Sequence, residues 1–172
     1  IAGCRACYLP ELYEAETNAA ENFARMCRRT FRDKANIAKL LTKLEAQQGI
    51  SYAPMQRQTL ELALKNQLLV ITGGPGTGKT TSIRAIRAMF DENGITTLLC
   101  APTGRAAKRM TELTGRDAAT VHRMLGAKFD EDNDRVVFTK DESDRLDCDA
   151  VILDECSMVD ICLMDALLRA LP

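Results

Sequence analysis

The sequence lacks the two kinds of hydrophobic segment that would take a chain to or across a membrane. It contains no run of about 18 consecutive apolar residues, so we predict no transmembrane helix and no membrane partner. Its first residues do not combine a basic start with an apolar stretch, which argues against a secretory signal peptide. With an apolar content of 46%, these absences favour a globular chain with a cytoplasmic location.

Histidine is scarce, and the cysteines do not form a recognisable framework. There is one histidine, and the seven cysteines are an odd number, so we expect reduced thiols and no disulfide scaffold. Cys4 and Cys7 have the spacing of zinc ligands or of a redox pair. Structural zinc needs four ligands, however, and neither a second such pair nor a partner histidine follows, so we expect neither zinc nor redox chemistry here.

The sequence also has no excess of charge of one sign: it contains 24 acidic and 23 basic side chains, and the net charge is −1. The balance gives no overall electrostatic argument for a nucleic-acid partner, but residues 25–43 hold seven basic residues and one acidic residue. We interpret this stretch as the basic face of a second N-terminal helix, either a solvated surface or a track for DNA phosphates. Its members are Arg28, Arg29, Arg32, Lys34, Lys39 and Lys43.

The spacing of apolar residues predicts an α/β chain that begins with helices. Helical spacing over 12–26 and 37–44, with a stop at Gly49, predicts two helices, and Pro54 suits the start of a third. Short apolar runs predict buried strands at 68–72, 96–101 and 150–153, each followed by a helical pattern, which indicates a parallel sheet with crossovers. Residues 129–146 are polar and acidic, and we expect a surface excursion with a hairpin near 136–138.

Residues 73–80 fit the phosphate-binding loop pattern G-x-x-x-x-G-K-[ST]. Glycine lets backbone amides point inward at phosphate oxygens, and the helix that opens near Lys79 adds its positive end. Lys79 is expected to bridge the β- and γ-phosphates, and Thr80 to hold Mg²⁺. We therefore predict ATP and Mg²⁺ as ligands, with a cofactor-binding set of Gly73, Gly74, Pro75, Gly76, Thr77, Gly78, Lys79, Thr80 and Thr81.

An acidic pair, Asp154 and Glu155, follows the apolar run at 150–153. Asp154 is expected to hold the Mg²⁺ shell and Glu155 to orient or deprotonate the attacking water, which makes both, with Lys79, the predicted catalytic residues. The alternative is a pair of helix-capping acids.

Three more motifs follow the loop in order: Ala-Pro-Thr-Gly-Arg-Ala-Ala at 101–107, Ala-Thr-Val-His-Arg-Met-Leu at 119–125, and Asp-Glu-Cys-Ser-Met at 154–158. Together with the loop they resemble a RecD-like DNA helicase of superfamily 1, related to the exodeoxyribonuclease V alpha subunit. The resemblance implies a P-loop NTPase (RecA-like) α/β fold, truncated, over 51–172, preceded by a small helical segment over 1–50. It also implies ATP-driven 5′ to 3′ movement on single-stranded DNA with duplex unwinding, in DNA recombination or repair, with other recombination or nuclease subunits as partners.

The resemblance assigns roles to individual residues. Gln56, 23 positions before Lys79, stands where the family places a glutamine that reads adenine; Gln58 is a second candidate, and a solvated helix-face glutamine is the alternative. The implied DNA contacts have plainer alternatives, namely a helix cap with an exposed arginine and a packed or capping histidine. These contacts are Pro102, Thr103, Gly104, Arg105, Thr120 and His122.

The sequence also departs from the family pattern. Ala53 stands where a serine or threonine helix cap is usual. Family members continue beyond the equivalent of Pro172 into another strand and a second motor domain with an arginine for the ATP site, so we expect this chain to be a piece of a longer protein. Alone, it should hold half of an ATP site and neither unwind DNA nor hydrolyse ATP at a motor's rate. Two other functions stay open, a nucleotide-dependent switch or binding module and an RNA-directed motor.

Overall fold

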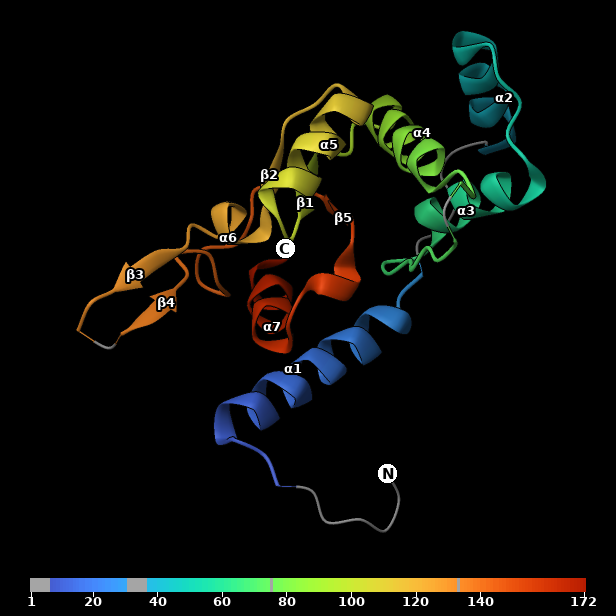
Figure 1. Cartoon of the computed structure of the whole chain (residues 1–172). Coiled ribbons are helices and arrows are strands. Elements are labelled where there is room, and N and C mark those ends of the chain that lie inside the picture. Colours follow the sequence, from blue (N-terminus) through green and yellow to red (C-terminus); the bar gives the residue numbers. More distant parts are fainter. Residues whose placement is uncertain (1–6, 31–36, 75, 133) are drawn as a thin grey trace.

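The computed structural model describes residues 7–30, 37–74, 76–132 and 134–172 (Figure 1). The chain begins with helices, as predicted, and then alternates strands and helices. The elements are α1 (Pro10–Cys27), α2 (Ile37–Gln48), α3 (Pro54–Lys65), α4 (Lys79–Glu92), β1 (Thr97–Ala101), α5 (Gly104–Thr114), β2 (Ala118–Thr120), α6 (Val121–Met124), β3 (Lys128–Asp130), β4 (Arg135–Val137), β5 (Ala150–Leu153), the 3₁₀ turn η1 (Cys156–Met158) and α7 (Ile161–Ala170).

The central sheet has the strand order β2-β1-β5, and both pairings are parallel. Leu99 of β1 lies opposite Ile152 of β5, and Ala101 lies opposite Thr120 of β2. The parallel α/β fold predicted from the sequence is therefore confirmed. β2 was not predicted, because an Ala-Ala-Thr segment has little strand preference of its own and is a strand here through its pairing with β1.

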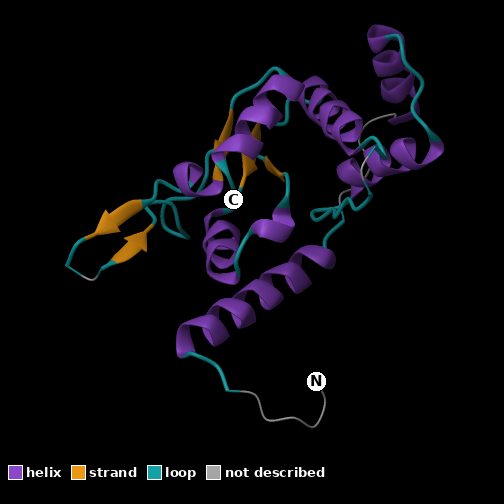
Figure 2. Cartoon of the chain, viewed as in Figure 1, coloured by secondary structure: helices purple, strands orange, loops and turns teal. Residues whose placement is uncertain are grey.

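The strand predicted at 68–72 is wrong. This segment, which leads into the phosphate-binding loop, has no ladder pairing and runs as loop between α3 and α4 (Figure 2). A strand needs a partner for its backbone groups, and 68–72 pairs with no described strand, although β5 has an open edge. Val70 is accordingly 67% exposed, although Ile71 still packs against the apolar cluster around α4.

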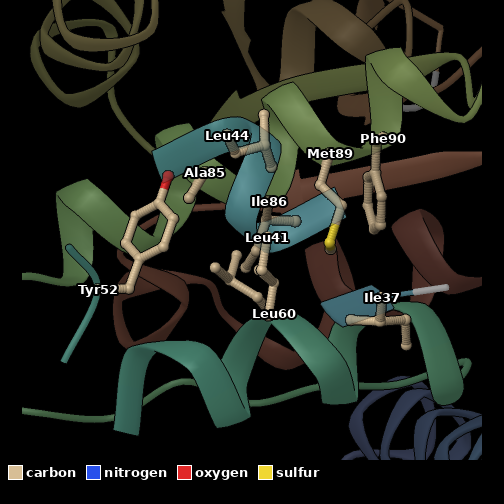
Figure 3. Packing of buried hydrophobic residues seen from close by; sticks show 9 residues of the cluster. All are labelled: Ile37, Leu41, Leu44, Tyr52, Leu60, Ala85, Ile86, Met89 and Phe90. Atoms are coloured by element: carbon tan, nitrogen blue, oxygen red, sulfur yellow. The ribbon is translucent and has the colours of Figure 1, made fainter. Parts of the chain in front are cut away.

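A first apolar cluster joins α2, α3 and α4 (Figure 3). Leu60 of α3 and Met89 of α4 are fully buried, and Leu44 of α2 is nearly so. Packing of this kind holds α4, and with it the loop from which α4 starts, against the two helices that precede it. The division at residue 50 between a helical segment and a motor domain stays a prediction, since it runs through this packed region.

A second apolar cluster lies between the sheet and α7. Leu163 and Leu167 of α7 pack with Cys100 of β1 and with Val121 and Leu125 around α6. α1 lies along α7 (Figure 1) and buries Ala15 and Ala19. The first helix is therefore part of the same packed body as the sheet.

The excursion between β2 and β5 is a hairpin, as predicted. β3 and β4 pair antiparallel, with Phe129 opposite Val136, and both side chains are exposed. The hairpin projects away from the sheet (Figure 1). Among the described residues, no helix is long and apolar enough to cross a membrane.

Asp165 on α7 provides a test of the packing between α1 and α7. It is 8% exposed and its buried Oδ1 has no hydrogen-bond partner among the described residues, and burial raises the pKa of the carboxyl above the ordinary value, against the opposing charge of Arg169. A raised pKa in the folded state means that ionisation of Asp165 destabilises the fold at neutral pH, while at about pH 3 and below the carboxyl is largely neutral in both states. We expect Asp165→Asn to raise Tm at pH 7 by about 2–4 °C, corresponding to ~1 kcal/mol, and the gain to vanish in acid.

Thermal unfolding followed by circular dichroism between pH 3 and pH 8 measures this effect. Asp117→Asn, at an exposed position, is the matched control and should leave Tm unchanged. A lower Tm for Asp165→Asn at pH 7 would show that the charged carboxylate stabilises the helix pair.

Candidate functional site: the phosphate-binding loop and the carboxyl edge of the sheet

The loop before α4 has a conformation that depends on glycine. Gly76 and Gly78 have φ values of +74° and +81°, in the left-handed region where other residues are strained. Thr77 donates a hydrogen bond from Oγ1 to the carbonyl of Gly74 at 2.9 Å. A Cβ at Gly73 would lie 2.6 Å from the same Oγ1, so the turn closes too tightly for a side chain there. Pro75, also predicted to bind the nucleotide, lies outside the described residues.

α4 begins at Lys79, directly after Gly78. Its first turn therefore presents free backbone N–H groups and the positive end of the helix dipole toward the loop, which suits an anion. The Lys79 ammonium donates to the carbonyl of Gly73 and, at 2.9 Å, to that of Gly74, so it lies over the loop. Thr80 and Thr81 are half-buried in the same turn.

Gln56 lies against this loop. It is the third residue of α3, and its Oε1 accepts a hydrogen bond from the Ala53 backbone N–H at 3.0 Å. Its Nε2 is close enough to Gly78 that a Cβ there would be 2.5 Å away. The prediction that Ala53 provides no side-chain cap is confirmed, and Gln56 satisfies one backbone donor of that helix start instead. Gln58 is exposed, and adenine recognition by either residue stays a prediction.

The acidic pair follows β5 directly. The Asp154 backbone N–H donates to the Cys100 carbonyl of β1 at 3.0 Å, and its Oδ1 accepts from the Glu155 N–H at 3.0 Å. Glu155 has φ +54°, a left-handed conformation that is uncommon outside glycine and clusters at functional sites. Its carboxylate is exposed.

The segments predicted to contact DNA also begin where strands end. Thr103 follows β1 and caps α5, where Oγ1 accepts from the Ala106 N–H at 3.2 Å. Thr120 ends β2 and caps α6, where Oγ1 accepts from the Arg123 N–H at 3.2 Å. Gly104 and Arg105 are exposed, and Pro102 is half-buried. The helix-cap alternative stated for Thr103 is thus confirmed, and Thr120 caps a helix in the same way. Neither cap tests a contact with DNA.

Parallel pairing brings these segments to one edge of the sheet. The register aligns Ala101 with Thr120 and Cys100 with Leu153, so residues 102–105, 120–122 and 154–155 all follow the carboxyl ends of adjacent strands. Ligands of open parallel sheets bind at this edge. No hydrogen bond or ion pair among the described residues joins the loop to Asp154 or Glu155. Ile71 and Ile152, each two residues before its motif, pack against the same apolar cluster.

His122 contacts an aromatic ring rather than a charged group. Its ring centroid lies 6.0 Å from that of Phe138, with the planes tilted by 48°. His122 is exposed, so it is not a packed core histidine, and its contact with DNA stays a prediction.

The basic stretch at 25–43 is not one helix face, so that interpretation is wrong. Arg28 and Arg29 follow the end of α1, whereas Lys43 lies on α2 and pairs with Glu92 of α4. Arg32 and Lys34 lie outside the described residues. The helical spacing had separated the two helices, but the interpretation of the basic stretch assigned Arg28 and Arg29 to the second of them.

The described cysteines, which do not include Cys4, are free thiols. Burial raises the pKa of the Cys100 thiol to about 12, so it stays protonated inside the sheet. In the described part of the chain, no three residues of the metal-binding types cluster together.

A glycine-rich loop opening a helix, together with an acidic pair ending a parallel strand, defines a P-loop NTPase domain. Residues 56–172 match the family model described as AAA domain, and the chain belongs to this family.

Relatives confirm the resemblance to RecD-like helicases. The chain is 36% identical over 165 residues to the ATP-dependent RecD2 DNA helicase of Deinococcus radiodurans, covering 96% of this chain and 22% of that protein. It is 36% identical over 138 residues to the RecBCD enzyme subunit RecD of Mycolicibacterium smegmatis (67% of this chain, 24% of the relative). It is also 36% identical over 110 residues to the ATP-dependent DNA helicase dda of Enterobacteria phage T4 (63% and 25%). The chain thus spans about a quarter of the length of these relatives.

The position of Lys79 over the loop predicts that nucleotide binding depends on its charge. Lys79→Ala should reduce the affinity for a non-hydrolysable ATP analogue with Mg²⁺ below detection, because the ammonium offsets much of the triphosphate charge. Isothermal titration calorimetry of the chain measures this. Lys65→Ala, which removes a half-exposed lysine paired with Glu61 at the end of α3, is the control. Equal affinities for Lys79→Ala and the parent would contradict the assignment of the loop.

Proposed function

We propose that the chain is the nucleotide-binding part of an ATP-dependent DNA helicase or translocase. The observation that carries this proposal is the shared carboxyl edge of β2, β1 and β5, where the acidic pair and the segments predicted to contact DNA follow neighbouring strands. A motor has to couple the state of its nucleotide to its hold on a nucleic-acid strand, and adjacent strand ends offer a short route for that coupling.

In this proposal the loop binds the triphosphate. Backbone N–H groups of Gly74, of residues 76–79 and of the start of α4 surround the phosphates, and Lys79 exchanges its contacts with the Gly73 and Gly74 carbonyls for the β- and γ-phosphate oxygens. Gln56, already against Gly78, is placed to meet the base. An amide both donates and accepts hydrogen bonds, as the adenine edge requires.

Oxygen donors suited to Mg²⁺ are present in both halves of the proposed site. The Thr80 hydroxyl has no hydrogen-bond partner among the described residues, and Asp154 uses Oδ1 for the Glu155 N–H while Oδ2 has no such bond. Hydroxyl and carboxylate oxygens are the ligands that Mg²⁺ prefers. When bound, Mg²⁺ would neutralise charge on the phosphates, and Glu155 would orient the attacking water and accept its proton at the carboxylate.

Nucleic acid would meet the neighbouring strand ends. The exposed Arg105 guanidinium and the free N–H groups at the start of α5 suit phosphate oxygens, and Pro102, Thr103 and Gly104 shape that turn. Thr120 and His122 would extend the contact along β2. We propose single-stranded DNA as the polymer, 5′ to 3′ polarity, and a role in recombination or repair, all by analogy with the relatives.

The relatives also suggest the wider setting. Several are named as RecBCD enzyme subunits, so other recombination or nuclease subunits are proposed partners. We propose a cytoplasmic location and a division into a helical segment, 1–50, and the first motor domain, 51–172. A nucleotide-dependent switch would bind ATP without stimulation by a nucleic-acid strand, and an RNA-directed motor would prefer RNA. ATPase assays of the whole protein with single-stranded DNA, single-stranded RNA or no polymer therefore separate the three functions.

Replacement of Arg105 tests the contact with DNA. Arg105→Ala should weaken binding of a labelled single-stranded oligonucleotide and reduce the slope of log K against log salt by about 0.7, the contribution of one phosphate contact. Fluorescence anisotropy over a salt series measures the slope. The control is Arg84→Ala on α4, an exposed arginine with no ion pair among the described residues. A slope unaffected by Arg105→Ala, or a clear preference for duplex, would count against this placement.

Replacement of Glu155 separates binding from chemistry. In the whole protein, Glu155→Gln should leave ATP affinity nearly unchanged and lower the turnover by about 100-fold or more, the typical effect of losing a positioned general base. Steady-state ATPase assays and nucleotide titration provide the two measurements, with Glu112→Gln on α5 as a control at an exposed carboxylate. Equal loss of binding and turnover would mean that Glu155 is needed for the structure of the site.

A further inference from the structure

Three arginines gather at the end of α1. Arg25 lies in the last turn, Arg28 is the C-cap, and Arg29 follows it. The Arg28 N–H donates to the Arg25 carbonyl and the Arg29 N–H to the Met26 carbonyl, which continues the helical turn. The three arginine side chains are therefore attached to the backbone within about 6 Å along the helix axis. With Glu21 and Ala24 they line a hollow of about 410 Å³ on the surface.

These arginines differ from several basic residues on the other helices, which have acidic partners. Arg28 and Arg29 have no side-chain hydrogen bond or ion pair among the described residues. Arg25 donates to Asn22 Oδ1 at 2.5 Å rather than to Glu21, the acid that lines the hollow. A helix C-terminus favours one nearby cation through its dipole, but that effect does not account for three. Paired basic residues elsewhere include Lys43 with Glu92, Arg57 with Glu45, Arg87 with Asp91, and Arg169 with Glu142.

The arginine cluster is tied to the chain that leads into the phosphate-binding loop. Thr30, the residue after Arg29, forms an antiparallel bridge with Asn66, which caps the end of α3. Gly73, the first residue of the loop, follows Asn66 by seven positions. The end of α1 accordingly lies near α3 (Figure 1). A ligand bound by these arginines would therefore act on the segment between Asn66 and Gly73, which sets the position of the loop.

We propose that Arg25, Arg28 and Arg29 form a second binding site for the phosphodiester backbone of single-stranded nucleic acid, separate from the strand ends of the sheet. The inference rests on the proposed function, because it adds a contact to the same polymer. Planar guanidinium groups bind phosphate oxygens through paired N–H donors, and an open hollow with one acidic residue suits a chain of phosphates. Contacts of this kind position a strand without reading its sequence.

The test compares two double variants of equal charge change. Arg28→Gln with Arg29→Gln removes the two arginines without partners, and Arg84→Gln with Arg145→Gln removes two exposed arginines from α4 and from the segment before β5. Binding of a fluorescein-labelled 20-nucleotide oligothymidine is followed by anisotropy from 20 to 300 mM NaCl. We expect the first variant to lower the salt slope by about 1.4, from two lost phosphate contacts, and to weaken binding at 100 mM salt about tenfold or more. We expect the control variant to match the parent.

Each other outcome overturns the inference in a recognisable way. A parent chain that fails to bind oligothymidine at 20 mM salt refutes both this site and the DNA part of the proposed function. A parent that binds and loses affinity only on Arg105→Ala refutes this site alone. Equal losses in both double variants mean that general charge is responsible. Polyglutamate of matched charge is the competitor that tests the kind of ligand. If it displaces the labelled oligonucleotide with the same efficiency as unlabelled oligothymidine, the cluster binds acidic chains in general. Matched circular dichroism spectra and unfolding temperatures establish that the variants are folded.

Discussion

β5 packs half-buried apolar side chains on both of its faces, and the two halves of the proposed site depend on that packing. Because successive side chains of a strand point to opposite faces, Ala150 and Ile152 enter the cluster around α4 while Val151 and Leu153 enter the cluster beneath α7. The strand thus joins the helix that starts at the phosphate-binding loop to the helix that follows the acidic pair. A polar residue at Ile152 would weaken the cluster around α4, and one at Leu153 would weaken the cluster beneath α7. Because both residues lie on β5, either change would affect both halves of the site.

The loop and the acidic pair are held by different means. Left-handed glycines and Lys79 shape the loop, and the N-terminal turn of α4 continues it into the apolar cluster formed with α2 and α3. Glu155 is held in its left-handed conformation by the 3₁₀ turn that follows, where the Met158 N–H donates to the Glu155 carbonyl at 3.0 Å. One element needs glycine, while the other tolerates a strained glutamate because its neighbours are fixed.

Local patterns predicted most of this architecture. Helical periodicity and capping signals located α1, α2, α3 and α4, and the apolar run at 150–153 coincides with β5. The errors arose where partners decide structure. β2 is a strand only because β1 lies beside it, and residues 68–72 carry a strand-like sequence without a neighbour to pair with. Motif spacing named the loop and acidic residues, but it could not show that Gln56 touches Gly78 or that Arg28 and Arg29 leave the end of α1, since both depend on how helices pack.

The packing of α1 has a consequence for how the acidic pair is supported. α7 starts at the Asp160 cap, whose Oδ1 accepts from the Leu163 N–H at 2.9 Å, five residues after Glu155. One side of α7 packs toward the sheet through Leu163 and Leu167, and α1 lies along α7. Helices packed at native density move as units and do not deform continuously. If a ligand bound to the arginines at the end of α1 shifted that helix, α7 would therefore shift with it as a whole. The short turn between Glu155 and α7 is the element that would change conformation to accommodate that shift.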